Sequence, residues 1–307
     1  MPWTGYARRM LLPGILAATV LAAAPPLGDL PSLPAPIYGG TAVAPGEWPA
    51  VVAISVGTFL CTGTLVSPNV VITAAHCLDS DPSVANIVVR RGHDINSPVP
   101  AINAIAYGAD PEFCGEETCK EDIHDYGFII LASSQNDVPA FPRAIADQHE
   151  WDDLMRVNNE ITVVGYGLNE GDITGIKRQV EIPITRFSGS GREFQAGGMG
   201  MDSCQGDSGG PAFAKLGDEW LLVGITSRGY TCGKGGFYAV PLGGACWLAQ
   251  ESGFDLRPAD CEACDCINTD PTRNDGCGCA TGDPRAGASG SLALLALLAA
   301  LRRRRRR

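Results

Sequence analysis

The chain has 307 residues, an apolar fraction of 45% and a net charge of −11. This acidic balance argues against a nucleic-acid-binding protein, for which a basic surface is typical. Twelve cysteines are many for a cytosolic protein of this length, and they favour an oxidising compartment with disulfides.

The first residues have the pattern of a secretory signal peptide. Arg8 and Arg9 precede an apolar stretch, Met10–Ala24, which ends in small residues and is short for a membrane span. We predict a signal peptide over residues 1–24 and a short proline-rich leader over residues 25–36. The arginine pair could also belong to a twin-arginine signal, but such pairs are common in ordinary signal peptides, so ordinary secretion is favoured.

Residues 37–256 are predicted to form the folded body. Short runs rich in Val, Ile and Thr alternate with Gly, Pro, Asn and Asp turns, which is typical of β-strands. The predicted strands are Trp48–Val56, Thr62–Ala75, Asn86–Gly92, Tyr126–Ser133, Glu160–Gly167, Lys177–Thr185 and Glu219–Ser227. A helix is expected only near the end of this body, around Gly243–Gly253. Regularly spaced strands predict an all-β fold, either a sandwich or a pair of barrels.

The C-terminal part has three segments. Residues 257–290 are a cysteine-rich linker, Ser291–Leu301 is almost entirely Ala and Leu, and six arginines end the chain. An apolar run of eleven residues is short for a transmembrane helix, which needs about 20. A terminal basic cluster is expected to stay on the cytoplasmic side of a membrane. This arrangement resembles the MYXO-CTERM sorting tail, which implies sorting to a bacterial cell surface and transient membrane association of residues 291–307.

The tail cysteines leave two interpretations open. Cys261, Cys264, Cys277 and Cys279 could supply four thiolates to zinc, but their irregular spacing in a secreted chain favours disulfides. The arginine cluster could be a nucleic-acid tail, but the apolar run directly before it favours the sorting signal.

Three motifs in the body carry residues suited to nucleophilic catalysis. His76 lies next to last in "VVITAAHC", Asp125 opens the apolar run "DYGFIIL", and Ser208 lies in "GDSGGP". A serine hydroxyl is a weak nucleophile unless an imidazole takes its proton, and a buried carboxylate can orient that imidazole. Glycines beside the serine let backbone N–H groups approach a developing oxyanion.

In this order, over residues 37 to about 253, the motifs resemble those of the trypsin-like serine proteases of the chymotrypsin fold. The resemblance implies two six-stranded antiparallel β-barrels with a short C-terminal helix, and no cofactor or metal. It implies that His76 is the general base, Asp125 its orienting acid and Ser208 the nucleophile. The backbone N–H groups of Gly206 and Ser208 match the oxyanion hole.

The resemblance also implies a substrate preference. Asp202 matches the acid at the base of the primary specificity pocket, which favours cleavage after Arg or Lys. Ser227, Gly229 and Gly236 match other substrate-binding positions. Arg228 departs from the family, which usually has Trp there, and its cation is expected to compete for the field of Asp202 or to shift preference at neighbouring subsites.

A further implication is activation by proteolysis. In the family, a newly freed N-terminal ammonium, here that of Ile37, pairs with an acid matched by Asp207. Pro36 precedes Ile37, so self-activation by tryptic cleavage is not expected; either another protease acts, or the N-terminus matures differently.

Disulfides are expected at three places in the body. Cys61–Cys77 and Cys204–Cys232 match family disulfides. Cys114 and Cys119 lie in an insertion before Asp125 and are predicted to pair with each other, whereas Cys246 is expected to pair into the tail.

These observations predict a secreted, surface-sorted serine endopeptidase that acts on protein or peptide substrates. The alternative is an inactive homologue that serves as a binding module, since an unreleased Ile37 would leave a zymogen. A surface structural protein would leave the three ordered motifs unexplained.

Overall fold

The computed structural model describes residues 37–115 and 118–272. The predicted signal peptide, leader and apolar, arginine-rich tail lie outside the described residues, as do Cys277 and Cys279. None of the described helices is long and apolar enough to cross a membrane.

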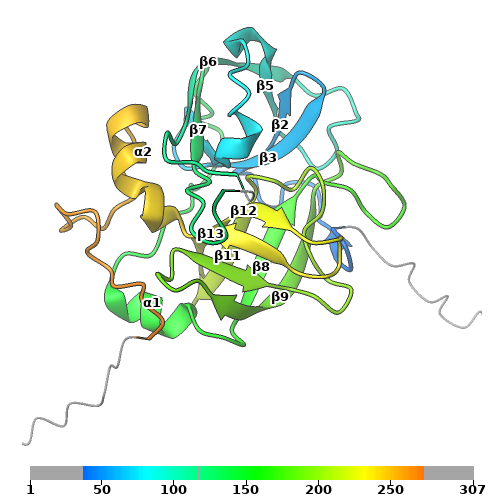
Figure 1. Ribbon diagram of the computed structural model, residues 1–307. Coiled ribbons are helices and arrows are strands. Elements are labelled where there is room, and N and C mark those ends of the chain that lie inside the picture. Colours follow the sequence, from blue (N-terminus) through cyan, green and yellow to red (C-terminus); the bar gives the residue numbers. More distant parts are fainter. Residues whose placement is uncertain (1–36, 116–117, 273–307) are drawn as a thin grey trace, which may run out of the picture. The chain divides into compact units, whose positions relative to one another are not determined.

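Two closed antiparallel barrels make up the described chain (Figure 1). The first closes in the order β2-β3-β4-β7-β6-β5. Its strands are β2 (Val51–Val56), β3 (Phe59–Leu65), β4 (Val70–Thr73), β5 (Ile87–Arg90), β6 (Ala101–Ala109) and β7 (Gly127–Leu131). Apolar side chains from every strand of this barrel fill its core.

The second barrel runs β9-β10-β13-β12-β11-β8 and closes through the pairing of β8 with β9. Its strands are β8 (Glu160–Gly165), β9 (Arg178–Phe187), β10 (Glu193–Ala196), β11 (Pro211–Leu216), β12 (Glu219–Gly229) and β13 (Gly236–Ala239). The short strand β1 (Thr41–Ala42) joins it along β9. The prediction of two six-stranded barrels is therefore confirmed.

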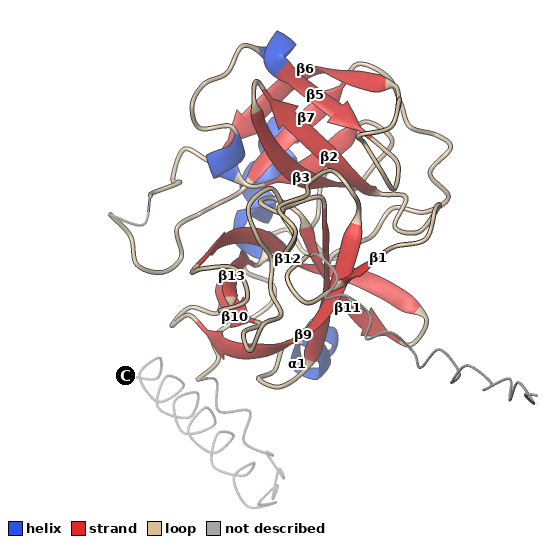
Figure 2. Cartoon of the chain, turned by 90° about the vertical axis from the view of Figure 1, so that its right-hand side faces the viewer, coloured by secondary structure: helices blue, strands red, loops and turns tan. Residues whose placement is uncertain are grey.

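Helical segments are few and short. They are η1 (Ala75–Cys77), η2 (Val84–Asn86), η3 (Pro241–Gly244), α1 (Gln148–Leu154) and α2 (Ala245–Ser252). The predicted C-terminal helix is confirmed as η3 followed by α2, and it ends where Gly253 takes a left-handed backbone conformation. Both α-helices lie outside the barrels in Figure 2.

The sequence interpretation and the structure differ in three respects. Thr62–Ala75 is not one strand, because the chain turns at Ser67–Asn69, where Val66 donates to Val70 (3.0 Å), and then enters η1. Helix α1 was missed because it has only seven residues, although Asp147 caps it by accepting from the Glu150 N–H (2.9 Å). Strands β6, β10, β11 and β13 were also missed, since they are short or rich in Ala and Gly.

The barrels meet through polar as well as apolar contacts. The hydroxyl of Tyr166, which follows β8, donates to the carbonyls of Val51 (3.2 Å) and Gly92 (2.5 Å) in the first barrel. Thr62 of β3 donates its N–H to the Ser208 carbonyl (2.8 Å) and its hydroxyl to the Gly206 carbonyl (2.8 Å). The loop that carries Ser208 is therefore held at the junction of the two barrels.

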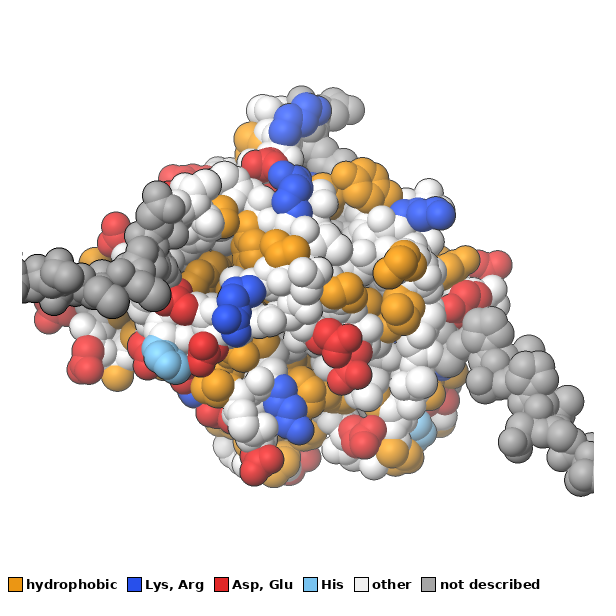
Figure 3. Space-filling model, turned by 90° about the horizontal axis from the view of Figure 1, so that it is seen from below, with side chains coloured by type: hydrophobic (Ala, Val, Ile, Leu, Met, Phe, Trp, Pro, Cys, Tyr) orange, Lys and Arg blue, Asp and Glu red, His pale blue; other side chains and the backbone are white. Residues whose placement is uncertain are grey.

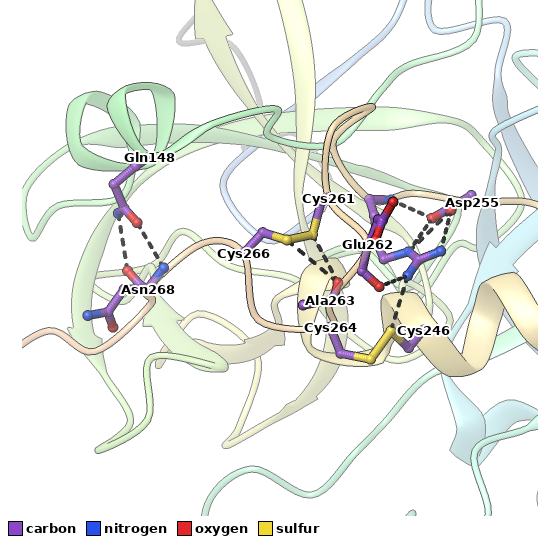
Figure 4. The surroundings of a disulfide bond; sticks show 10 residues. Gln148, Cys246, Asp255, Cys261, Glu262, Ala263, Cys264, Cys266 and Asn268 are labelled. Carbon is purple, nitrogen blue, oxygen red and sulfur yellow. Dashed lines mark hydrogen bonds and ion pairs between the residues drawn. A yellow bond between two sulfur atoms is a disulfide. The ribbon is translucent and has the colours of Figure 1, made fainter.

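Residues 257–272, here called the C-terminal strap, are fastened to the second barrel. Cys246 of α2 is bonded to Cys264, and Cys261 is bonded to Cys266 (Figure 4). The Asn268 N–H donates to Gln148 Oε1 (2.8 Å), while Ile267 is buried in the core of the second barrel. The expected pairing of Cys246 into the tail is confirmed, and the zinc interpretation of Cys261 and Cys264 is wrong because both form disulfides.

The molecular face shown in Figure 3 mixes charges of both signs. Acidic and basic side chains lie among apolar ones there and do not separate into a basic and an acidic half.

Candidate active site

His76 and Asp125 come from neighbouring strand ends of the first barrel. His76 lies in η1, directly after β4, and Asp125 lies two residues before β7, which pairs with β4. His76 Nδ1 is 2.8 Å from Asp125 Oδ2, and the His76 backbone N–H donates to Oδ1 (2.9 Å). Because a carboxylate oxygen accepts, Nδ1 carries the hydrogen, and Nε2 is left as the basic nitrogen.

The Asp125 carboxylate is fully buried, and both of its oxygens accept hydrogen bonds. In addition to His76, it accepts the hydroxyl of Ser227, at 2.6 Å from Oδ2. Ser227 lies on β12, so the second barrel contributes to holding the acid of the first. Three donors stabilise the ionised form inside the protein, where an unpaired carboxylate would be costly.

Ser208 lies in a tight turn that contacts the disulfide next to His76. Gly206 takes a φ of +99°, a left-handed conformation in which a side chain would be strained. The Ser208 carbonyl lies 3.7 Å from Cys77 Sγ, and the same sulfur lies 3.9 Å from His76 Nε2. The serine segment and the basic nitrogen of His76 therefore converge on the Cys61–Cys77 disulfide.

Two backbone donors lie in the same turn. Among residues 37–115 and 118–272, no protein acceptor takes a hydrogen bond from the N–H of Gly206 or of Ser208. The carbonyl of Gly206 is bound by Thr62, which sets the orientation of this part of the turn. Two available donors on either side of Asp207 are suited to a developing oxyanion.

Asp202 is buried at the start of the same loop. Its backbone N–H donates to the Tyr38 carbonyl (2.9 Å), and its Oδ1 accepts the Ser203 N–H (2.7 Å). Burial raises its pKa to about 6. A Cβ on Gly236 would lie 3.1 Å from Asp202 Oδ1, so the small residue leaves space beside the carboxylate, whereas Gly229 is exposed nearby on β12.

Asp207 is fully buried and accepts only backbone donors among the described residues. These are the N–H groups of Gly167 (2.7 Å) and Cys204 (2.9 Å), and burial raises the pKa of Asp207 to about 7. A Cβ on Gly165 would lie 2.1 Å from Oδ1, which explains the glycine there. Ile37 is also fully buried, in the core of the second barrel, and its neighbour Tyr38 pairs with Asp202 of the same loop.

Arg228 is paired with an acid of the second barrel. Its guanidinium forms two hydrogen bonds with the buried carboxylate of Glu193, at 2.7 and 2.9 Å, and lies 4.2 Å over the Phe237 ring. Its expected effect on the field of Asp202 or on the neighbouring subsites stays a prediction.

The three predicted body disulfides are confirmed. They are Cys61–Cys77, Cys114–Cys119 and Cys204–Cys232. Cys61, His76 and Cys77 lie close enough to suggest a metal cluster, but the two sulfurs are bonded to each other and are not thiolate ligands.

Sequence reasoning missed Thr62 and Glu193. Thr62 holds Gly206 and Ser208 from the other barrel, and Glu193 binds Arg228. Neither residue belongs to a motif, and their partners lie 35 or more positions away, so no local signal pointed to them.

A comparison with protein-family models gives one matching family. The model described as Trypsin matches residues 37–242, about two thirds of the chain and nearly all of both barrels.

Proposed function

The chain belongs to the trypsin family and is a serine-type endopeptidase, and on this premise we propose that it is made as a secreted precursor. Once Ile37 is released, the mature enzyme cleaves protein or peptide substrates after Arg or Lys. The buried Asp202 carboxylate beside Gly236 carries the specificity part of this proposal. Within the described chain, Asp202 forms no ion pair with a cationic side chain, so a substrate cation would be its partner.

The proposed reaction proceeds through an acyl-enzyme. Ser208 Oγ attacks the substrate carbonyl carbon while His76 Nε2 accepts the serine proton, and the oxyanion is bound by the N–H groups of Gly206 and Ser208. His76 then gives the proton to the leaving amine as the C–N bond breaks. Water, deprotonated by His76, hydrolyses the ester and restores Ser208. Asp125 stabilises the imidazolium form of His76 throughout.

Activation is proposed to depend on Ile37 and Asp207. An ammonium released at Ile37 would pair with the buried Asp207 carboxylate and stabilise the turn that holds Gly206 and Ser208. Since Pro36 precedes Ile37, the chain's own preference for Arg or Lys does not provide this cleavage. A different protease is therefore the proposed activator.

Secretion and surface sorting are proposed from the chain ends. Residues 1–24 would direct export, and residues 291–307 would direct sorting to a bacterial surface through a transient membrane contact. The five disulfides of the described chain support an oxidising destination. N-terminal sequencing of the protein recovered from its native cell surface tests this; a mature chain beginning at Ile37 is expected.

The experiment for the enzymatic proposal uses the chain with a removable leader whose removal leaves Ile37 as the first residue. We expect turnover of Arg and Lys ester substrates, little turnover of a Phe ester and none in the Ser208→Ala variant. Asp202→Ser is the matched pocket variant, and it should lose the preference for Arg and Lys over Phe. Turnover of the Phe ester alone would disprove the specificity while leaving the catalytic roles intact.

The same assay decides the alternative. A chain that begins at Ile37, binds proteins and turns over none of the three esters would be an inactive homologue that acts as a binding module.

A further inference from the structure

The loop before Asp125 has an unfavourable backbone. Asp122 and His124 have φ values of +54° and +55°, whereas non-glycine residues seldom adopt positive φ. Such residues cost on the order of 1–3 kcal/mol each and persist only where the surroundings impose the conformation. Asp125 follows His124 directly, so whatever holds this loop also sets the position of the acid.

Glu193 of β10 holds the loop from the second barrel. Its Oε2 accepts the Asp122 N–H (2.8 Å), and its Oε1 accepts the Ile123 N–H (3.2 Å). The Glu193 side chain is only 3% exposed, and Ile123 is buried. A buried carboxylate that accepts successive backbone N–H groups fixes the peptide planes between them.

Arg228 compensates the charge of the buried Glu193 carboxylate. Besides its two bonds to Glu193, its Nη2 lies 3.3 Å from the Lys120 carbonyl at the start of the same loop, and its side chain is 10% exposed. The loop is thus bound at both ends of the segment 120–123 by one ion pair. A buried pair of this kind needs good geometry and further hydrogen bonds, and both are present here.

Ser227 and Arg228 are consecutive residues of β12 that act on the same loop. Ser227 donates to the Asp125 carboxylate, and Arg228, through Glu193, holds the peptides of Asp122 and Ile123. Successive strand residues point to opposite sides, so one strand can hold both the side chain of the acid and the backbone before it.

We propose that Glu193 and Arg228 are positioning residues for catalysis: their ion pair fixes the backbone of residues 120–123 so that Asp125 is held against His76. The inference rests on the proposed catalytic roles of Asp125 and His76. It gives Arg228, which stands where the family usually has Trp, a role that does not involve contact with substrate.

The test compares Glu193→Gln, Arg228→Met and Arg228→Lys in the chain that begins at Ile37. Active-site titration gives the amount of competent enzyme, so kcat per titrated site is independent of the folded fraction. We expect kcat on an Arg ester to fall by up to about 100-fold in Glu193→Gln and Arg228→Met, as for a small displacement of a catalytic group. Arg228→Lys keeps the charge without the two-pronged contact, so its kcat should lie between that of Arg228→Met and that of the unmodified chain.

The pH profile separates positioning from a general loss of stability. If Asp125 moves away from His76, the imidazolium loses its partner, and the apparent pKa in kcat/KM falls. Among the described residues, the ionisable groups in this region include Glu193 and Arg228, Arg186 beside Glu121, Asp122 beside Ser188, and Asp110 and Glu112 beside His124. Only Glu193 or Arg228 changes in the variants, so a shift reports on their pair.

Arg143→Met is the matched control. Arg143 forms the same kind of two-pronged pair with Glu150, at 2.8 and 2.7 Å, and within the described chain it forms no hydrogen bond or ion pair with residues 120–125. Its kcat and pH profile should equal those of the unmodified chain.

Two results would overturn the proposal: variants that lose only titratable sites while kcat and pH profile stay unchanged, or variants that raise KM alone. If Glu193→Gln and Arg228→Met fail to fold, Arg228→Lys decides, and unmodified kcat and pH profile in that variant would refute the role. If the unmodified chain is itself inactive, the proposed function fails rather than this inference.

Discussion

Asp125 and Asp207 are two fully buried carboxylates of one site, and their surroundings differ. Asp125 accepts from an imidazole, a backbone N–H and a hydroxyl, all supplied by the folded chain. Asp207 accepts two backbone N–H groups, and burial raises its pKa to about 7. The Asp125 carboxylate is thus fully hydrogen-bonded in the full-length chain, whereas the Asp207 carboxylate has no cationic partner among the described residues, as the proposed activation by release of Ile37 requires.

On the proposed activation, this difference predicts that release of Ile37 acts on one half of the site. The His76–Asp125 arrangement depends on strand pairing and on Ser227, far from Ile37 in the chain. The turn that carries Gly206 and Ser208 is bordered by Asp207, so its energy depends on whether that carboxylate has a counterion. Four predictions test the comparison.

The largest loss of activity is expected from a change at Asp125. Asp125→Asn should lower kcat about 10⁴-fold, because a neutral amide cannot stabilise the imidazolium and favours the wrong tautomer of His76. Steady-state kinetics on an Arg ester with the chain that begins at Ile37 measures this. Ser227→Ala, which removes one of the three donors, should cost far less, and equal losses in both variants would contradict the assignment.

A smaller loss of activity is expected from a change at Asp207. Asp207→Asn in the chain that begins at Ile37 should lower kcat/KM about 100-fold or more, since it leaves a buried ammonium unpaired. The matched control is the same substitution in the uncleaved precursor, whose low activity should not change. Activity equal to that of the unmodified mature chain would show that Asp207 is not the partner of Ile37.

The third prediction concerns the stability of the precursor, which Asp207→Asn should raise, although the same substitution lowers activity in the mature chain. In the precursor, the raised pKa of Asp207 means that the folded state retains a proton up to about pH 7, whereas the unfolded state releases it near pH 4. The free energy of unfolding should therefore fall between pH 5 and pH 7, by up to a few kcal/mol.

Asp207→Asn should remove most of this fall and make the precursor more stable than the unmodified chain at pH 7. Urea unfolding at both pH values measures it. Asp202, with a pKa raised to about 6, acts in the same direction, so Asp202→Asn in parallel shows its share. A precursor whose stability is the same at both pH values would mean that Asp207 is ionised before cleavage.

The smallest effect on activity is expected from the C-terminal strap. Thr269 donates to the Ser190 carbonyl (2.7 Å), and Ser190 donates its hydroxyl to Asp122 (2.7 Å), so the strap contacts the Asp125 half indirectly. Replacing Cys246 and Cys264 by Ser should lower stability by about 2–4 kcal/mol. We expect kcat to change less than threefold, because Glu193 still holds the loop.

Thermal unfolding and kcat are measured together on this double variant. A loss of kcat above tenfold would place the strap within the catalytic half.

Much of the site could be predicted from short stretches of sequence. His76, Asp125 and Ser208 stand in local patterns, since the glycines around Ser208 and the strand that ends three residues before His76 reflect constraints within a few residues. The barrels could be predicted from strand patterning and family resemblance. The boundaries of Thr62–Ala75 and the short helix α1 could not, because tertiary pairing decides where a short apolar run turns.

What the amino-acid sequence determined by itself is the chemistry: a serine, a histidine and an aspartate in a family order, with Asp202 and Asp207 at set distances from Ser208. What only the tertiary structure decided is which groups hold them. Thr62 holds Ser208, and Glu193 with Arg228 holds the loop before Asp125, and these contacts join residues far apart in the chain. The physical reason is that a buried charge must find its donors in space, and only the folded barrels bring those donors to it.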